Sequence, residues 1–99
     1  MTKPVRRLLI APVAEADLAE IWAYIAEESP RAATSFVTKI EAKFEPLLAF
    51  PGMGTPRDQI APGLRAMTFK NYVIYYTHTV DSLVIVRVVH GARDVRALF

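Results

Sequence analysis

The residue types in this chain that could carry out chemistry are mostly basic, and they gather toward its C-terminal end. Four of them could surround an RNA phosphodiester: Arg65, Arg87, His90 and Arg93. The arginines would stabilise developing negative charge, and the histidine would act as an acid or a base. Against this interpretation, a basic residue on a sheet more often pairs with a carboxylate or contacts a protein partner. RNA cleavage therefore stays open as an alternative to binding.

Metal and serine-nucleophile chemistry find no support in the sequence. His78 and His90 are the only histidines, they fall on different predicted strands, and the chain has no cysteine. No ligand spacing typical of a zinc site is therefore formed. The serines all have ordinary explanations as helix caps or turn residues: Ser29, Ser35 and Ser82. We predict no metal site and no cofactor.

The composition is typical of a single small domain without disulfides, with 99 residues, 53% of them apolar, and no cysteine. Residues 1–12 lack the apolar core and the cleavage site of a signal peptide, and no segment reaches transmembrane length. We therefore expect no membrane association and a cytoplasmic location.

Charge is divided unevenly along the chain, although the net charge is only +2. Residues 1–50 carry a net charge of −1, and residues 51–99 carry +3. Residues 13–28 contain acidic side chains and no basic one. We therefore expect an acidic first helix and a basic region near the last strand. The net charge is too small to indicate nucleic-acid binding.

Two amphipathic helices are predicted in the first half, after a short strand at residues 6–11. Pro12 favours a helix start, and an apolar stripe with helical spacing follows it: Leu18, Ile21, Trp22 and Ile25. Ser29 and Pro30 suit the cap and the first turn of a second helix. Its apolar stripe, over residues 33–48, predicts about four continuous turns. The short break between the helices predicts an antiparallel hairpin.

Strands dominate the second half of the chain. Residues 50–56 are rich in proline and glycine and are predicted to form a loop. Strands are predicted at residues 64–69, 72–77 and 83–90, joined by tight turns. The order β-α-α-β-β-β indicates an α+β fold, in which the two-helix antiparallel hairpin packs on one face of a mainly antiparallel sheet.

Arg87 interrupts the β-branched run of the last predicted strand. Period-2 alternation divides this strand into two faces. One face is apolar throughout: Val84, Val86 and Val88. The other face carries the cation: Leu83, Ile85, Arg87 and Val89. We predict that the apolar face holds the helical hairpin and that the Arg87 face is open to partners.

Four short motifs make the chain resemble a known protein family. They are DLAEIWAY at residues 17–24, PGMG at 51–54, PGLR at 62–65 and HGARD at 90–94. In this order and spacing, they resemble the ParE branch of the ParE/RelE superfamily of bacterial toxins. The resemblance begins near Leu9 and continues to the C-terminus, which implies that residues 1–99 form a single RelE/ParE-like toxin domain.

The resemblance implies a function as well as a fold. ParE-type toxins of type II toxin–antitoxin modules, which include plasmid-stabilisation proteins, poison DNA gyrase and block replication. A ParD-type antitoxin encoded beside each toxin neutralises it. The resemblance thus implies a protein that is not an enzyme and that contacts gyrase and an antitoxin, with no direct nucleic-acid binding by the toxin alone.

The sister RelE branch suggests an alternative, because its members cleave mRNA in the ribosome. Arg65 and Arg93 match basic positions of that branch. Other positions depart from it, where the branch has lysine, arginine and tyrosine: Met67, Val73 and Phe99. Phenylalanine has no hydroxyl to exchange a proton, and valine cannot stabilise a phosphorane-like charge. Binding is therefore favoured over cleavage. A third alternative is a non-toxic homologue that only binds its antitoxin.

Candidate contact residues follow from these expectations, and none of them is predicted to be catalytic. The candidates for gyrase binding are Arg65, Arg87, His90, Arg93, Arg96 and Phe99. The candidates for antitoxin binding are Trp22, Ile25, Phe36 and Ile40. For each of these four apolar residues, a place in the hydrophobic core is the alternative.

Overall fold

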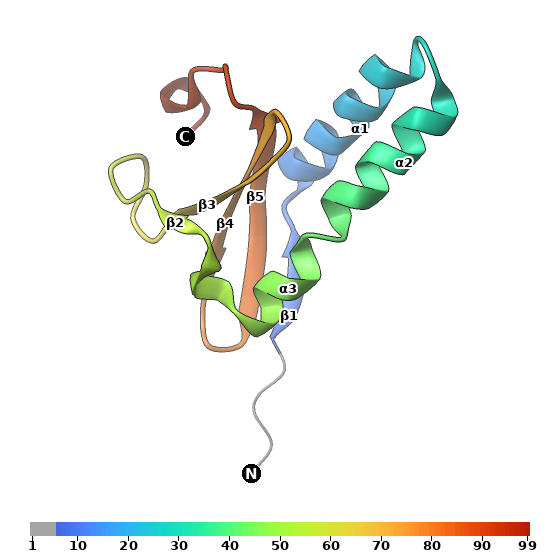
Figure 1. The fold of residues 1–99 in the computed structure, drawn as a ribbon. Helices are drawn as coiled ribbons and strands as arrows, with labels where there is room; N and C mark the ends of the chain where they lie inside the picture. Colours follow the sequence, from blue (N-terminus) through green and yellow to red (C-terminus); the bar gives the residue numbers. More distant parts are fainter. Residues whose placement is uncertain (1–5) are drawn as a thin grey trace.

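The computed structural model describes residues 6–99 and shows a sheet with helices along one face (Figure 1). The strands are β1 Arg7–Ile10, β2 Thr55–Pro56, β3 Arg65–Phe69, β4 Tyr72–His78 and β5 Ser82–His90. The helices are α1 Pro12–Ala26, α2 Pro30–Glu41 and α3 Phe44–Ala49, with short 3₁₀ turns at η1 Pro51–Met53 and η2 Val95–Leu98. This arrangement confirms the α+β class.

The sheet has five strands in the order β1-β5-β4-β3-β2. β1 is parallel to β5, and every other neighbouring pair is antiparallel. The prediction of a mainly antiparallel sheet is therefore confirmed. The predicted loop at residues 50–56 also contains β2, whose two residues pair with Ala66 and Arg65 of β3.

Proline and serine place the helix boundaries. Pro12 begins α1, and the Ser29 hydroxyl accepts a hydrogen bond of 3.1 Å from the Ala32 amide at the start of α2, as predicted. The prediction of one continuous second helix is wrong, because the chain breaks at residues 42–43 and restarts as α3. Pro46 explains this break, since it has no amide hydrogen to donate to the preceding turn.

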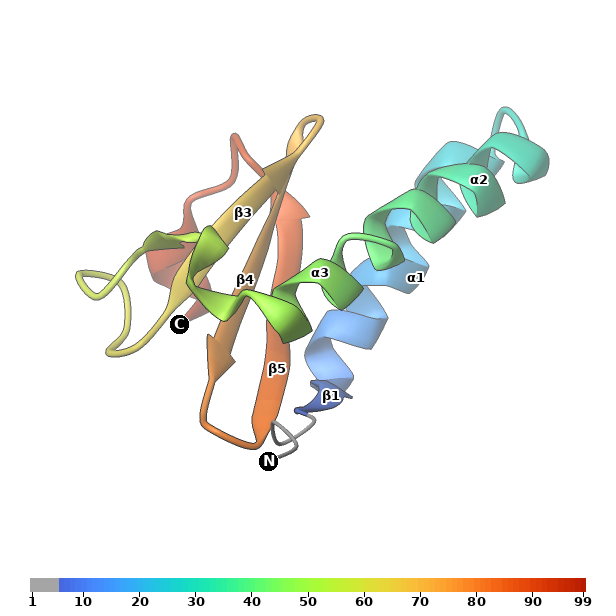
Figure 2. The same cartoon turned by 60° about the horizontal axis from the view of Figure 1, so that its bottom comes forward.

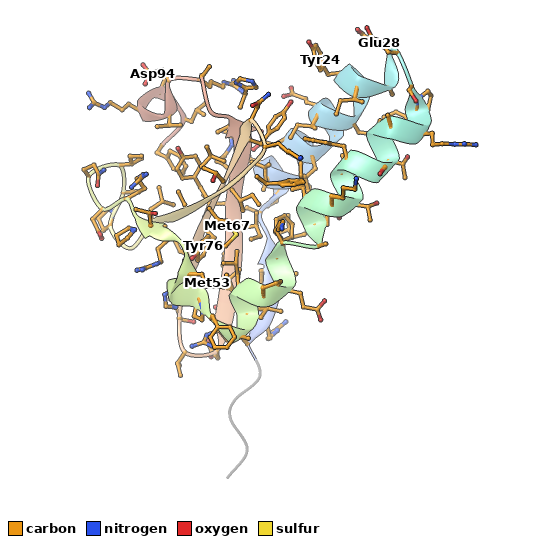
Figure 3. All side chains as sticks on the ribbon, in the orientation of Figure 1. Tyr24, Glu28, Met53, Met67, Tyr76 and Asp94 are labelled. Atoms are coloured by element: carbon orange, nitrogen blue, oxygen red, sulfur yellow. The ribbon has the colours of Figure 1, made fainter. Side chains whose placement is uncertain are left out.

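The helical hairpin extends past the sheet. α1 and α2 lie antiparallel and continue beyond the ends of β4 and β5, while α3 lies across the sheet near β1 (Figures 1 and 2). Tyr24 and Glu28 project at the free end of the hairpin, far from Asp94 in the C-terminal turn (Figure 3). The molecule is accordingly elongated, with extents of 49 × 31 × 21 Å.

Each face of the sheet carries its own hydrophobic cluster. The helix-side cluster joins the hairpin to β4 and β5, and its fully buried members include Ile40, Phe44, Leu47, Ile74, Tyr76, Leu83 and Ile85. The opposite cluster is smaller and consists of Leu64, Ala66, Tyr75 and Val89, with Ile60, Val95 and Leu98 packed against it. The loop before β3 and the C-terminal turn therefore cover the second face in part.

A β-bulge changes which side chains of β5 face the helices. Tyr75 pairs with Arg87, but Tyr76 pairs with Ile85, so Val86 is the extra residue. Beyond this point Val88 joins the helix-side cluster, while Val86 and Val89 pack on the opposite one. Before the bulge, Leu83 and Ile85 are the residues that belong to the helix-side cluster, and the bulge adds only Val88 to them. The prediction that Val84, Val86 and Val88 together hold the hairpin is therefore wrong.

The described residues show neither a membrane span nor a metal cluster. Among residues 6–99, no helix has the length and apolar character needed to cross a bilayer. In the same range, no group of three or more histidine, aspartate or glutamate side chains is placed to hold a metal ion. Residues 1–5, the first part of the segment considered for a signal peptide, lie outside the described range.

Candidate functional site

Arg87 is held inside the molecule by Asp17 of α1. Its Nε donates to Asp17 Oδ2 and one terminal nitrogen donates to Asp17 Oδ1, each at 2.8 Å. The two side chains are only 13% and 5% exposed. These hydrogen bonds, with the nearby acidic charge, outweigh burial and raise the pKa of Arg87 above its ordinary value. The prediction that Arg87 lies on an open face is therefore wrong.

Asp17 also completes the outer edge of the sheet. β1 pairs with β5 only as far as Ile85, so the edge of β5 beyond it lacks a neighbouring strand. There, the Val88 amide donates to Asp17 Oδ2 at 3.0 Å. One carboxylate thus accepts three hydrogen bonds and joins α1 to β5 just after the bulge. This arrangement stabilises the fold and leaves neither group free for a ligand.

Sequence reasoning overlooked Asp17, although a signal was present. Asp17 lies three residues after Ala14 and four before Ile21, and both of these residues are buried on the inner face of α1. A carboxylate on that stripe and a single cation in an apolar strand satisfy each other's need for an opposite charge. Matching the two would have predicted the pair.

Arg65 is also occupied within the chain. Its Nε donates to the Gly54 carbonyl at 3.1 Å, and a terminal nitrogen donates to the Gly52 carbonyl at 3.2 Å. The Gly54 amide donates to the Tyr76 hydroxyl at 2.8 Å, and that hydroxyl donates to the Pro51 carbonyl at 2.6 Å. Arg65 and Tyr76 therefore hold the loop before β2 against the sheet.

Gly54 is required by this close packing. A β-carbon at this position would lie 2.8 Å from Cε1 of Tyr76 and 2.9 Å from the Ala66 carbonyl oxygen. Contacts this short do not occur for real side chains, so only glycine fits without a shift of the loop. The prediction of a loop at residues 50–56 gave no sign of this role of Gly54 in packing.

The remaining candidates for target binding lie at the C-terminal end and are exposed. Arg93 and Arg96 have no acidic partner within 4.0 Å among residues 6–99. His90 accepts a hydrogen bond of 3.1 Å from the Ala92 amide through Nδ1, which leaves Nε2 free to face a ligand. The Phe99 ring is 42% exposed and meets Tyr75 edge-on at 5.3 Å between centroids.

A small groove lies between α1 and the ends of β4 and β5. It encloses about 160 Å³, and its polar lining includes Glu20, Tyr24, Tyr72, His90 and Arg93. Burial, with a smaller effect of Tyr24, raises the pKa of Tyr72, so this phenol stays neutral at ordinary pH and is able to donate a hydrogen bond. The groove also contains two carboxylates, Glu20 and Asp17, of which Asp17 already accepts hydrogen bonds from Arg87 and Val88. This mixture of polar groups suits binding of a polar side chain.

The four antitoxin-binding candidates have different environments. Trp22 is 40% exposed, and its indole nitrogen donates to the Thr34 hydroxyl at 3.1 Å. Ile25 and Phe36 are half-buried, and Phe36 stacks on Phe69 with 5.7 Å between ring centroids. Ile40 has no exposed surface. Its place is therefore in the core, which was the alternative for this residue, and it has no surface to offer a partner.

The three residues that depart from the RelE pattern do not form one site. Met67 packs against the helix-side cluster, whereas Val73 packs against the opposite cluster. Phe99 lies on Tyr75, which belongs to the opposite cluster as well. No arrangement of acid, base and cation equivalent to a ribonuclease centre is built at these positions.

The fold is shared with a protein of a known toxin–antitoxin system. A solved structure titled "Chromosomal ParDE TA system from P. aeruginosa" matches it with a TM-score of 0.74. The match covers 87% of this chain and 96% of the other, at 24% sequence identity. The two chains therefore share one fold.

Sequence comparisons identify the branch. The model of the ParE toxin family of type II toxin–antitoxin systems matches residues 8–95. Toxin ParE1 of Caulobacter vibrioides is 31% identical over 85 residues, which is 85% of this chain and 88% of that protein. Toxin ParE1 of Mycobacterium tuberculosis is 29% identical over 90% of this chain and 93% of that protein. The chain belongs to the ParE toxin family, and the resemblance seen in the sequence is confirmed.

Proposed function

We propose that this protein is the toxin of a type II toxin–antitoxin module, that it binds DNA gyrase in the cytoplasm and that it traps the enzyme in its DNA-cleaved state. A ParD-type antitoxin would neutralise it. The observation that carries the proposal is the family match over residues 8–95, which spans every helix of the fold and all of its strands except the first residue of β1.

The side chains at the positions compared with the RelE branch agree with a protein that binds its target and does not cleave RNA. The aromatic ring of Phe99 has no acidic proton, and Val73 has no charge. Arg65 and Arg87 have the charge that phosphoryl chemistry uses, but their guanidinium groups are bonded to loop carbonyls and to Asp17. The protein is therefore proposed to act as a poison by contact alone.

The proposed contact surface is the exposed C-terminal end. It consists of His90, Arg93, Arg96 and Phe99. Arginine and aromatic side chains are enriched among the residues that dominate binding energy in protein interfaces. Arg65 and Arg87 were candidates as well, but their internal bonds to loop carbonyls and to Asp17 make them structural supports of the fold instead.

A supercoiling assay with purified gyrase tests the proposal. The wild-type protein should inhibit supercoiling and accumulate cleaved DNA. The double variant Arg93→Ala/Arg96→Ala should need about tenfold more protein for the same effect, because it loses two exposed cationic contacts. The matched control is Arg7→Ala/Arg31→Ala, which removes the same charge from β1 and α2 and should inhibit like the wild type.

Other outcomes assign another function. Folded protein that leaves gyrase unaffected at micromolar concentration would contradict the proposal. Ribosome-dependent cuts in mRNA would instead indicate the RelE-like activity. Overexpression without growth arrest, together with tight antitoxin binding, would indicate a non-toxic homologue.

A further inference from the structure

A second groove lies on the other side of the hairpin, between the α2–α3 junction and the turn that joins β3 to β4. It encloses about 410 Å³. Its lining consists of three lysines and three apolar residues: Lys39, Lys43, Lys70, Ala42, Pro46 and Phe69. No acidic side chain is among them. This groove is the larger of the two described so far, and neither the gyrase contact nor the ion pair uses it.

The three lysines converge without a counter-charge. The only ion pair between side chains within residues 6–99 joins Arg87 to Asp17, so no carboxylate of the described chain lies within 4.0 Å of these lysine amines. Lys39 lies in the last turn of α2, Lys43 follows four residues later in the break before α3, and Lys70 lies in the turn between β3 and β4. Three positive charges around one groove repel each other until an anion enters.

The floor of the groove is aromatic. Phe69 stacks on Phe36, and the Lys43 amine lies over the Phe69 ring at 5.5 Å from its centroid. A base could stack on Phe69 only by displacing this amine. The apolar surfaces of Ala42 and Pro46 instead suit an aliphatic side chain. These features favour a peptide with carboxylates around an apolar residue over a nucleic acid.

Lys70 supports the same interpretation through its backbone. Its φ angle is +55°, in the left-handed region where a residue with a β-carbon is strained. Lysine gains nothing locally from this conformation, since it has no short side-chain group to bond the turn. The turn nevertheless places Lys70 in the lining of the groove.

We propose that this groove binds an acidic segment of the antitoxin, with glutamate or aspartate side chains on the three lysines and an apolar side chain against Phe69 and Pro46. The identity of the partner rests on the proposed function, whereas the chemistry of the segment rests on the groove. Phe36, one of the sequence-predicted contact residues, lies next to this floor. The lysines were not predicted.

A peptide titration tests the chemistry without the antitoxin. The probe is a synthetic helical peptide in which pairs of glutamates alternate with leucines, added to the isotope-labelled full chain and followed by amide chemical shifts. The shifts should concentrate at Lys39, Lys43, Phe69 and Lys70. Lys39→Ala/Lys43→Ala should weaken binding about tenfold, and Arg7→Ala/Arg31→Ala should change it less than twofold. Lys70→Gly, which also relieves the backbone, should weaken binding by a smaller factor.

Altered probes separate the alternatives. A peptide with glutamine for glutamate should lose binding, and one with alanine for leucine should bind more weakly. Equal binding of the glutamine peptide, shifts that map elsewhere, or equal weakening by the arginine control would overturn the proposal. Tighter binding of single-stranded DNA at the same residues would assign the groove to nucleic acid and overturn it as well.

Coexpression with the product of the adjacent reading frame tests the partner. The Lys39→Ala/Lys43→Ala toxin should arrest growth like the wild type but should need more antitoxin for rescue. Unchanged rescue would overturn the groove as the antitoxin site and leave the proposed toxin function intact. If the wild-type toxin arrests no growth, the proposed function fails, and the peptide titration still decides the chemistry of the groove.

Discussion

Two sets of cations beside the sheet, Arg87 and the pair Lys39 and Lys43, differ in burial and in pairing. At the bulge of β5, Arg87 is 13% exposed and forms two hydrogen bonds of 2.8 Å with Asp17. At the α2–α3 junction, Lys39 and Lys43 are exposed and have no acidic partner in the described chain. The first charge is part of the folded structure, and the second is free to meet another molecule.

This difference in burial and pairing shows how a cation near an apolar strand is to be interpreted. Burying a charge is costly unless an opposite charge and hydrogen bonds accompany it, so a buried cation indicates a partner within the same chain. An exposed group of like charges has no such requirement and indicates a partner outside the chain. The following predictions test whether the two places behave as these rules require.

The largest expected effect follows from breaking the buried pair. Asp17→Ala would leave the Arg87 guanidinium and the Val88 amide without their acceptor. We expect the free energy of unfolding to fall by about 3–5 kcal/mol, measured by chemical denaturation at neutral pH. Glu20→Ala, one turn later on the exposed side of α1, is the control and should change stability by less than about 0.5 kcal/mol. Similar losses of stability in Asp17→Ala and Glu20→Ala would contradict the conclusion that the buried ion pair is part of the folded structure.

A smaller loss of stability is expected when a buried hydrogen bond between neutral groups, that of the Tyr76 hydroxyl, is removed. Tyr76→Phe removes the hydroxyl that accepts from the Gly54 amide and donates to the Pro51 carbonyl. An amide left without a partner costs about 1–3 kcal/mol, and we expect a decrease in the free energy of unfolding within this range. Tyr24→Phe, at a side chain that is 73% exposed, should leave the unfolding midpoint unchanged. A Tyr76→Phe variant as stable as the wild type would show that the loop is not held by this hydroxyl.

Alkaline pH should weaken the fold through Tyr72, which lies beside Phe36 and His90. Burial raises its pKa above the ordinary value of 10.0, so the unfolded chain loses this proton at a lower pH than the folded chain. The contribution of the neutral Tyr72 side chain to the free energy of unfolding is therefore complete below pH 10, and it is lost as the pH rises toward the raised pKa. Denaturation curves in this range should show a shallower decline for Tyr72→Phe; identical slopes would exclude a contribution from Tyr72.

The smallest effect on stability is expected at the lysine groove. Lys39→Ala/Lys43→Ala removes exposed charges that repel each other, so the free energy of unfolding should stay within about 0.5 kcal/mol of the wild type or rise slightly. Thermal unfolding at low and at high salt measures this. A marked loss of stability would mean that these lysines, like Arg87, are bonded within the chain.

Local signals in the sequence were sufficient for most of the fold. Pro12 and Ser29 begin the helices, and β-branched and aromatic residues are frequent in β4 and β5, because propensity and capping act over a few neighbouring residues. The break before α3 was also encoded locally, since Pro46 cannot donate an amide hydrogen bond. The break was not predicted because the apolar stripe over residues 33–48 continues across it.

The candidate site was less predictable. All six candidates for gyrase binding were grouped because the last strand was expected to have an uncovered, basic face. His90, Arg93, Arg96 and Phe99 are exposed and stay candidates, whereas Arg65 and Arg87 are bonded within the chain. Their separate roles depend on loop carbonyls and a helix carboxylate that are distant in sequence.

The sequence by itself determined the α+β class, the membership of the ParE toxin family and the order of the elements apart from α3 and β2, because each rests on local patterns or short motifs. The tertiary structure alone decided the direction of the β5 side chains, since the bulge opposite Tyr75 depends on cross-strand register. It also decided which cations are free. Arg87 is neutralised by a residue 70 positions away, and the three lysines meet only because Phe69 packs under α2.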